Sequence, residues 1–248
     1  MHPTTSAVRL DRMALTNALI RLLARQTRFL EKEMLGLRQV VAPGGVCVDI
    51  GAAAGLYTAA LSELVGETGR VLRVEPLPFV HPLWTRILRA GRNVSHHTVA
   101  LAAEPGHGTM SVPVGRYGLV TGRSFLAWRT NGLGSNTEFA RHVEVQVEVD
   151  TLDALCARAG LSRLDFVKID VEGAELHVLA GGTQVIERFR PAILMEIEAR
   201  HLRRYGHSAQ TVVDWLLGRG YTMHSWDNAW REIAEVSARH RNYLFRSP

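Results

Sequence analysis

Three carboxylates closely follow one apolar segment, and this arrangement is the best suited to chemistry in the chain. A strand pattern that ends at Ile169 runs into Asp170, Glu172 and Glu175. In an open α/β sheet, ligands bind beyond the carboxyl ends of the strands, so Asp170 is expected to face a ligand. Acidic residues in a first helical turn also complement the helix dipole, and this leaves a structural role open for the two glutamates. The segment predicts a ligand site at the edge of a sheet.

A second strand, turn and helix pattern lies upstream, with small residues in the turn. Residues 46–50 form an apolar strand pattern and are followed by Gly51, three alanines and Gly55. Glycine permits backbone conformations that other residues avoid, and small side chains let a ligand approach the N-terminus of the next helix. The next predicted strand, 71–75, ends in Glu75, and a carboxylate there can accept both hydroxyl hydrogens of a ribose. Together the two strand ends predict a nucleotide-like cofactor.

The spacing of the glycines decides between two cofactors. A dinucleotide site has the pattern G-x-G-x-x-G, whereas this turn has the pattern D-x-G-x-x-x-G. It resembles the S-adenosylmethionine (SAM) site of a class I methyltransferase, and NAD fits it less well. In that resemblance Gly51 and Gly55 flank the methionine part of SAM, and Glu75 holds the ribose. The cofactor-binding residues expected on this basis are Asp49, Ile50, Gly51, Ala52, Gly55, Tyr57, Thr58, Glu75, Pro76, Ala100 and Asp170.

Five segments in the same order resemble the FkbM family of SAM-dependent methyltransferases. The most recognisable is the string KIDVEGAELHVLAG, and the others are the turn at Asp49 and the segments 74–76, 149–153 and 193–197. The segment 242–245 is also similar to the last strand of the family, so the resemblance runs from about residue 45 to residue 245. It implies methyl transfer from SAM to a hydroxyl of a small molecule or glycan, such as a sugar or a natural-product scaffold.

Methyl transfer to oxygen needs a held sulfonium, a hydroxyl in line with the methyl carbon, and a base. Positioning supplies most of the rate enhancement, and the base must come within hydrogen-bond reach of the hydroxyl. The residues that qualify as catalytic by their predicted position are Asp170, Glu172, Glu196 and His201. Asp170 can equally orient the amino group of the cofactor, and Glu196 can pair with an arginine. His201 has a suitable imidazole, but it is one of 11 histidines. The identity of the base stays open.

Hard oxygen ligands for Mg²⁺ are available at the same edge, in Asp170, Glu172 and Glu196. No strict spacing demands a metal, however. Lys168 lies two residues before Asp170, so strand alternation puts both side chains on one side of the sheet. Its ammonium can neutralise a carboxylate in place of a cation. Mg²⁺ is therefore a less favoured cofactor, and no metal ligands are assigned.

Composition and charge limit the class of protein and its partners. The 248 residues are 46% hydrophobic, as in an ordinary globular protein, and they include no apolar run of about 20 residues that would span a membrane. The net charge is +5, but the arginines are spread along the chain without an arginine-rich tract, which argues against nucleic acid. Cys47 and Cys156 suggest no disulfide framework. We expect a cytoplasmic protein, and a homo-oligomer is compatible with the sequence.

Two other functions remain open. One is a methyltransferase that acts on RNA or protein, which only the basic charge favours. The other is a noncatalytic module that binds SAM or its product and regulates a partner.

The alternation of strand and helix patterns predicts an α/β protein with a class I methyltransferase, Rossmann-like fold. Its sheet should be mainly parallel and seven-stranded, with helices on both faces and an antiparallel last strand. We expect strands at about 46–50, 71–75, 94–100, 164–169, 192–197, 221–227 and 241–246, and helices at about 55–65, 79–90, 151–159, 173–188 and 208–219. Residues 1–42 should form an N-terminal helical extension, and residues 43–248 the methyltransferase domain.

One region departs from this alternation. Between Glu104 and His142 there are seven glycines and two prolines, and the stretch is longer than most connections. Residues 142–149 then alternate strictly, as in a strand with one buried face. We therefore predict an inserted loop or hairpin before the fourth strand. Its residues Trp128, Asn131, Ser135 and Asn136 can form a lid over the acceptor, and a solvated loop with the tryptophan in the core is the alternative.

Overall fold

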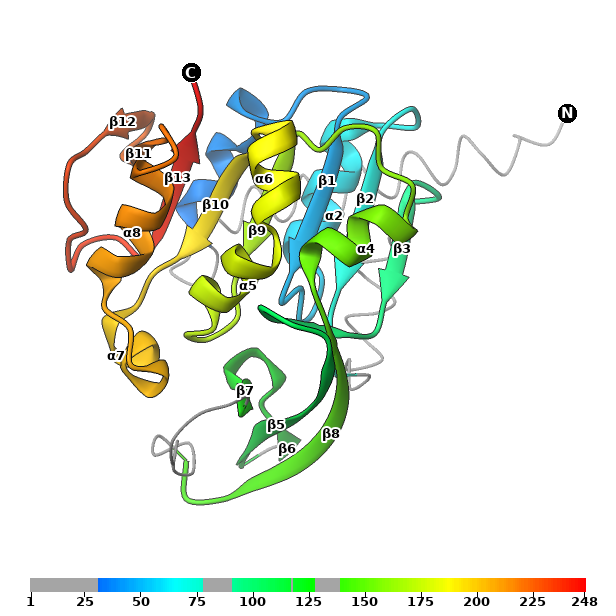
Figure 1. Cartoon of the computed structure of the whole chain (residues 1–248), viewed down its shortest axis with the longest axis vertical. Helices are drawn as coiled ribbons and strands as arrows, with labels where there is room; N and C mark the ends of the chain where they lie inside the picture. Colours follow the sequence, from blue (N-terminus) through cyan, green and yellow to red (C-terminus); the bar gives the residue numbers. More distant parts are fainter. Residues whose placement is uncertain (1–30, 78–90, 117, 128–138) are drawn as a thin grey trace, which may run out of the picture.

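The computed structural model describes residues 31–77, 91–116, 118–127 and 139–248. Within these residues an eight-stranded sheet has the order β12-β11-β13-β10-β9-β1-β2-β3 (Figure 1). Its strands are β1 Val46–Ile50, β2 Arg70–Val74, β3 Val94–His97, β9 Phe166–Ile169, β10 Ala192–Glu196, β11 Thr222–Trp226, β12 Trp230–Glu232 and β13 Asn242–Arg246. Neighbouring strands from β3 to β10 are parallel.

The far side of the sheet is antiparallel, so the sheet is mixed. β13 runs antiparallel between β10 and β11, which confirms the antiparallel last strand. The predicted number of seven strands is wrong among the described residues, because β12 pairs with β11 at the edge. This strand has three residues, too few to show an alternation in the sequence. Trp230 in β12 packs edge-on against Trp226 in β11, with ring centroids 5.2 Å apart.

The helices of the described residues are α2 Leu56–Val65, α4 Leu152–Arg158, α5 Glu175–Gly181, α6 Thr183–Phe189, α7 Ala199–Leu202 and α8 Ala209–Leu217, with the 3-10 helices η1 Lys32–Gln39, η2 Thr121–Arg123 and η3 Arg203–Tyr205. The single helix predicted at 173–188 is wrong. The backbone leaves helical geometry at Gly182, where a side chain would lie 2.7 Å from Leu152. α7 and η3 were not predicted.

Two of the predicted elements lie wholly or mostly outside the described residues. They are the helix at 79–90 and the N-terminal extension, of which the structure describes the part from residue 31 onward. That part contains η1, whose Leu37 is buried against the sheet.

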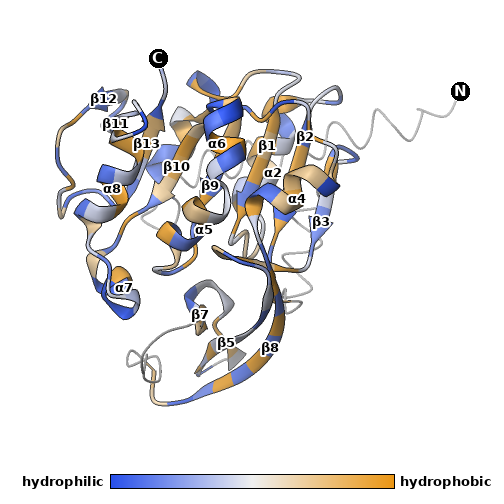
Figure 2. Ribbon diagram, in the orientation of Figure 1, coloured by the Kyte–Doolittle hydropathy of each residue, from blue (hydrophilic) through white to orange (hydrophobic). Residues whose placement is uncertain are grey.

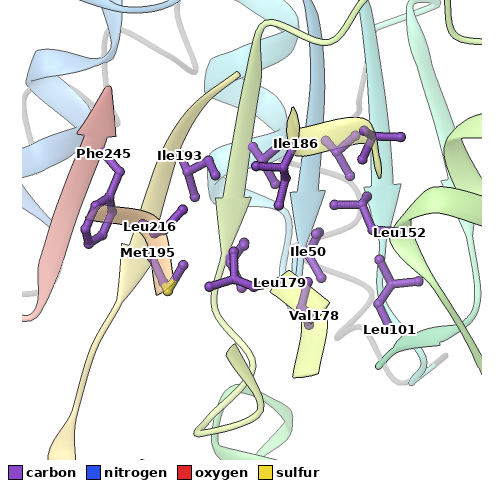
Figure 3. Close-up of a cluster of buried hydrophobic side chains, with 14 of the residues drawn as sticks. Ile50, Leu101, Leu152, Val178, Leu179, Ile186, Ile193, Met195, Leu216 and Phe245 are labelled. Atoms are coloured by element: carbon purple, nitrogen blue, oxygen red, sulfur yellow. The ribbon is translucent and has the colours of Figure 1, made fainter. Parts of the chain in front are cut away.

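The two faces of the sheet are covered by different helices, as the strand alternation requires. On one face, apolar side chains of the strands pack against α4, α5, α6 and α8, in a core that includes Ile50, Ile193, Val178 and Leu216 (Figure 3). On the other face, Cys47 and its neighbours pack against α2 and η1. Figure 2 shows the strands as mainly apolar ribbons between these layers. Helices on both faces are therefore confirmed.

A second sheet, which we call the arm, projects from the edge where the parallel strands end (Figure 1). It contains β4 Ala100–Leu101, β5 Gly106–Gly115, β6 Gly118–Leu119, β7 Phe125–Ala127 and β8 His142–Asp150. β5 and β8 pair antiparallel from Gly106 with Val149 to Pro113 with His142. The inserted hairpin is confirmed by the pairing of β5 with β8. The proposed lid residues, Trp128 to Asn136, lie outside the described residues.

The arm has a small core of its own. Met110, Val112, Leu126, Val147 and Val149 are buried there. Hydrophobic and hydrophilic residues alternate along β8 in Figure 2. The side chains of β8 become more exposed with distance from the main sheet, and Val143 at the far end is 40% exposed. The strand predicted at 94–100 is wrong at its end: β3 stops at His97, and β4 pairs with β8 in the arm.

Two further findings bear on the predicted class of protein. In the part of the chain that the structure describes, no helix is long and apolar enough to cross a membrane. Both cysteines are buried and unpaired.

Candidate active site

The turn after β1 touches the turn after β9, and a glycine makes this contact sterically feasible. Gly51 has a φ of +74°, and a Cβ there would lie 1.7 Å from the carbonyl oxygen of Asp170. The Asp170 amide donates a hydrogen bond to the Ile50 carbonyl at 3.0 Å. A side chain at Gly51 would force these two turns apart. Gly51 therefore allows the carboxyl ends of β1 and β9 to lie close together.

The carboxylate of Glu75 organises the turn after β1 from the neighbouring strand end. Its oxygens accept hydrogen bonds from the Ala53 amide at 2.7 Å and the Leu77 amide at 2.9 Å. Burial raises the pKa of Glu75, and these two hydrogen bonds oppose the rise. Each carboxylate oxygen has two lone pairs, so both oxygens can still accept a hydrogen bond from a ligand. Arg73 donates to the Ala53 carbonyl at 2.5 Å and holds the same turn.

A pocket that is partly open to solvent lies between the sheet edge and the arm. The lining residues beside the strand ends of the main sheet are Ile50, Gly51, Ala53, Val74, Glu75, Pro76, Asp170, Val171, Glu172 and Ala174, joined by Val99 and by Ala100 and Leu101 of β4, and the residues further along the arm are Met110, Thr121, Gly122, Ser124 and Leu126. The pocket therefore contains six of the residues expected to bind the cofactor, Asp170 among them, and two of the expected catalytic residues, Asp170 and Glu172.

Other residues expected to bind the cofactor support the pocket and do not line it. Asp49 is 1% exposed and accepts a hydrogen bond from the Thr58 hydroxyl at 2.5 Å. Burial raises the pKa of Asp49 to about 6. The Tyr57 hydroxyl donates to Glu31, and its ring lies 5.0 Å from Lys168 Nζ. Contact between SAM and these residues, or Ala52 and Gly55, stays a prediction.

Lys168 and Asp170 lie on the same side of β9, as predicted. Lys168 Nζ is 3.3 Å from Asp170 Oδ2 and 3.2 Å from Asn242 Oδ1, and the side chain is 1% exposed. Burial disfavours its ammonium, but Asp170 and other nearby carboxylates raise the pKa of Lys168 above its usual value. Burial likewise acts to raise the pKa of Asp170, and Lys168 lowers it on balance. An ion pair between the buried Lys168 and the partly exposed Asp170 therefore lies at this edge.

Glu196, at the end of β10, joins Asp170 from the next strand. The two carboxyl groups share a hydrogen bond. Burial and the charge of Asp170 raise the pKa of Glu196 far above its usual range. Of the two carboxyl groups, Glu196 therefore holds a proton more readily than Asp170 does. The pairing with an arginine that the sequence allowed is replaced by a pairing with a carboxylate.

Glu172 and His201 meet beside this pair, across another close backbone contact. His201 Nδ1 lies 2.8 Å from Glu172 Oε2. Glu172 has a φ of +54°, which is unusual for a residue with a side chain. A Cβ on the next residue, Gly173, would lie 2.5 Å from the His201 carbonyl oxygen. All four expected catalytic residues are therefore gathered at the carboxyl ends of β9 and β10.

The model of the methyltransferase FkbM domain matches residues 49–223 of the chain. The chain belongs to the FkbM methyltransferase family. This match covers both the turn at Gly51 and the string around Asp170, and it confirms the family that the sequence resembled.

Similarity to individual FkbM and other methyltransferases is more limited. The 2-O-methyltransferase NoeI of Sinorhizobium fredii is 41% identical over 46 residues, which are 18% of this chain and 19% of that protein. A methyltransferase FkbM from Methylobacillus flagellatus is 15% identical with a TM-score of 0.45, over 82% of this chain and 43% of that chain. The O-methyltransferase TomG from Streptomyces achromogenes is 14% identical with a TM-score of 0.44, over 92% and 78%. The chain thus matches less than half the length of the first two proteins.

One glutamate of the FkbM string has a structural role. Glu175 is 2% exposed, and its Oε1 accepts a hydrogen bond from the Gly173 amide at 3.0 Å. Burial raises the pKa of Glu175 to about 7. This contact closes the turn that carries Glu172, so the structural alternative given for Glu175 has direct support.

The arm residues of the pocket were missed as individual residues. The signal for them was the long glycine-containing stretch, which indicated a functional segment but not which side chains point inward.

The arm also contacts the opposite side of the site. The Tyr205 hydroxyl donates to the Leu126 carbonyl at 2.7 Å, and the Arg204 guanidinium lies 4.6 Å from the centre of the Phe125 ring.

Proposed function

We propose that this FkbM protein is a SAM-dependent O-methyltransferase that acts on a hydroxyl of a small molecule or glycan, such as a sugar or a natural-product scaffold. The observation that carries this proposal is the pocket that joins Glu75, Asp170 and Glu172 to the arm. A methyl donor and an acceptor must share one enclosed space, because the reacting atoms have to be held in line.

The residues of the sheet edge fit a SAM molecule. The turn at Gly51 and Ala53 exposes backbone to the pocket, and Glu75 retains lone pairs for the hydroxyl groups of a ribose. Asp170 lies further along the same edge and can accept a hydrogen bond from the amino group of the methionine part. When bound there, SAM supplies an electrophilic methyl group on a sulfonium.

The arm offers a wall suited to a hydroxylated acceptor. Two residues with hydroxyl groups, Thr121 and Ser124, and two apolar residues, Met110 and Leu126, line the pocket on this side. Such a mixture can hold both the polar groups and the carbon skeleton of a polyol. The partial match to NoeI, a 2-O-methyltransferase, supports oxygen as the acceptor atom.

The proton of the acceptor hydroxyl must leave to a group at the carboxyl edge. Asp170 and Glu172 line the pocket, and His201 contacts Glu172. A base is expected on the side of the pocket that would hold the methionine end of SAM, and these groups are its candidates. The arrangement serves proton removal without requiring any residue of the arm to take part in it.

The first test is a calorimetric titration of the purified protein with S-adenosylhomocysteine and, separately, with NAD. We expect micromolar binding of S-adenosylhomocysteine, followed by turnover in a screen of sugars and hydroxylated metabolites. A response to NAD alone would overturn the proposal. Binding of S-adenosylhomocysteine without turnover on any hydroxylated acceptor would favour a noncatalytic module. Nucleic-acid binding that falls steeply with salt would favour an RNA methyltransferase.

The acid edge is tested with Asp170→Asn and His201→Ala. Both variants should bind S-adenosylhomocysteine within several-fold of the wild type, and both should lose most of their turnover. Asp227→Asn, at a side chain that is 69% exposed, is the matched control and should keep its turnover. Normal turnover in both edge variants would mean that the proton leaves by another route.

A further inference from the structure

We propose that Glu172, Glu196 and His201 form a binding site for a divalent transition-metal ion such as Mn²⁺ or Zn²⁺. The three side chains come from three elements: the turn after β9, the end of β10 and α7. One potential ligand atom from each lies within 4.8 Å of the other two.

The distances within the trio suit one ion. Two ligands about 2.1 Å from a metal lie about 3 Å apart at a right angle and about 4 Å apart on opposite sides. His201 Nδ1 and Glu172 Oε2 are 2.8 Å apart, and the whole trio stays within 4.8 Å. Small side-chain rotations therefore suffice to place all three atoms around one centre.

The imidazole of His201 has no hydrogen-bond partner that would explain its burial. It is 2% exposed, and neither ring nitrogen makes a hydrogen bond among the described residues. The 2.8 Å approach of Nδ1 to Glu172 lacks the alignment of a hydrogen bond. A buried polar atom left without a partner costs free energy. Coordination of a metal would satisfy the nitrogen. It would also explain why His201 Nδ1 and Glu172 Oε2 lie so close together.

The ligand set indicates which ions fit. Carboxylates alone favour Mg²⁺ or Ca²⁺, whereas imidazole suits transition metals such as Zn²⁺. The three-carboxylate set considered for Mg²⁺ loses Asp170, because Lys168 occupies that carboxylate at 3.3 Å. His201 replaces Asp170 as the third proposed ligand. One imidazole and two carboxylates match Mn²⁺ or Zn²⁺ better than Mg²⁺.

The surroundings hold two ligands in place and leave room for a substrate. Gly173 lets the turn that carries Glu172 approach the backbone of His201, which brings these two ligands together. Glu172 lines the pocket, so a coordination position of the ion would face the acceptor. Catalytic metal sites keep such a position open.

The role of the ion in catalysis rests on the proposed function, whereas its binding does not. The acceptor hydroxyl would coordinate the ion, which lowers the pKa of the hydroxyl. Its proton passes to Asp170, the oxygen forms a bond to the methyl carbon, and the bond from sulfur to that carbon breaks. The electron pair of the broken bond stays on sulfur, which leaves S-adenosylhomocysteine.

The test is a calorimetric titration of the chelator-treated, full-length protein with Mn²⁺, Zn²⁺ and Mg²⁺ in turn. We expect one equivalent of Mn²⁺ or Zn²⁺ to bind with a micromolar Kd, and Mg²⁺ to bind more weakly. Glu196→Gln and His201→Gln should each weaken binding by at least about 10-fold. His107→Gln is the matched control, because His107 is exposed in the arm. Circular dichroism checks that each variant is folded.

A spectroscopic measurement separates a bound ion from a merely structural effect of the variants. The electron spin-echo spectrum of bound Mn²⁺ should show coupling to an imidazole nitrogen, and Glu196→Gln should keep this coupling if it binds at high Mn²⁺. His201→Gln should lose it. The proposal is overturned if none of the ions binds up to about 1 mM, or if His201→Gln binds as the control does. Titration with S-adenosylhomocysteine in parallel reports on the proposed function separately.

Discussion

The two walls of the pocket are built in different ways. On the sheet edge, Gly51, Glu75 and Asp170 each follow directly after a parallel strand, so the chain around each residue determines its place. On the arm, Met110 and Leu126 are placed by antiparallel pairing between distant segments, such as Met110 with Val145. The arm also packs on its own small core. The comparison suggests that binding of the methyl donor and choice of acceptor depend on separate parts of the structure.

The largest effect should come from Gly51→Ala, which attacks the sheet edge directly. Its Cβ would lie 1.7 Å from the Asp170 carbonyl oxygen at a φ of +74°. We expect loss of more than about 3 kcal/mol, the scale of severe backbone strain, in stability or in S-adenosylhomocysteine binding. Calorimetric titration and thermal unfolding measure the two. Gly122→Ala, in the arm, has nothing within 4 Å of its Cβ and is the control. If the two variants have the same stability and the same affinity for S-adenosylhomocysteine, the sheet edge is no more sensitive to substitution than the arm.

Glu75→Ala should weaken binding of S-adenosylhomocysteine by about 1–3 kcal/mol, because it removes a charged hydrogen-bond partner. The measurement is the Kd from calorimetry. Glu67→Ala, at an exposed position after α2, should leave the Kd unchanged. Unchanged affinity in a folded Glu75→Ala protein would take Glu75 out of the cofactor site.

Thr121→Trp tests whether the arm binds the acceptor and not the cofactor. A large side chain at the pocket wall obstructs the acceptor, so its KM should rise by about 10-fold, while the Kd of S-adenosylhomocysteine stays within two-fold. Steady-state kinetics with an acceptor found by screening gives the first value, and calorimetry the second. A comparable loss of S-adenosylhomocysteine binding would show that the arm serves the cofactor as well.

The smallest effect concerns stability, through the buried Asp49 beneath the sheet edge. Its pKa is about 6 in the folded protein and 3.8 in a model peptide. A raised carboxyl pKa gives stability that is present below pH 3.8 and is lost as the pH rises through about 6. Relative to Asp49→Asn, the wild type should therefore lose about 1 kcal/mol between pH 5 and pH 7. Urea unfolding at the two pH values measures this, with Asp227→Asn as the exposed control. A wild type that gains stability over this range would contradict the assignment.

Much of the sheet edge could be predicted because its signals are local. The apolar runs before Gly51 and Asp170 indicated strands, and the residues after them had to reach one edge of a parallel sheet. The gathering of Asp170, Glu172, Glu196 and His201 followed from the same rule. The break at Gly182 was missed because helical spacing continues through it, and the close approach of Gly182 to Leu152 joins segments that are distant in sequence.

The arm and the partners within the site could not be read in the same way. Nothing near Met110 in sequence shows that it will pair with Val145, because that register depends on two segments far apart in the chain. The hydrogen bond between Glu196 and Asp170 likewise depends on the spacing of neighbouring strands. Short elements such as β12 and η3 carry too few residues to show a period.

The short segment that contains α7 and η3 has two attachments. It carries His201 to the acid edge, and through Arg204 and Tyr205 it contacts Phe125 and Leu126 of the arm. A displacement of the arm therefore pulls on the backbone next to the imidazole. The segment is thus a bridge between the two walls of the pocket, joined to the arm by one hydrogen bond and one cation–π contact.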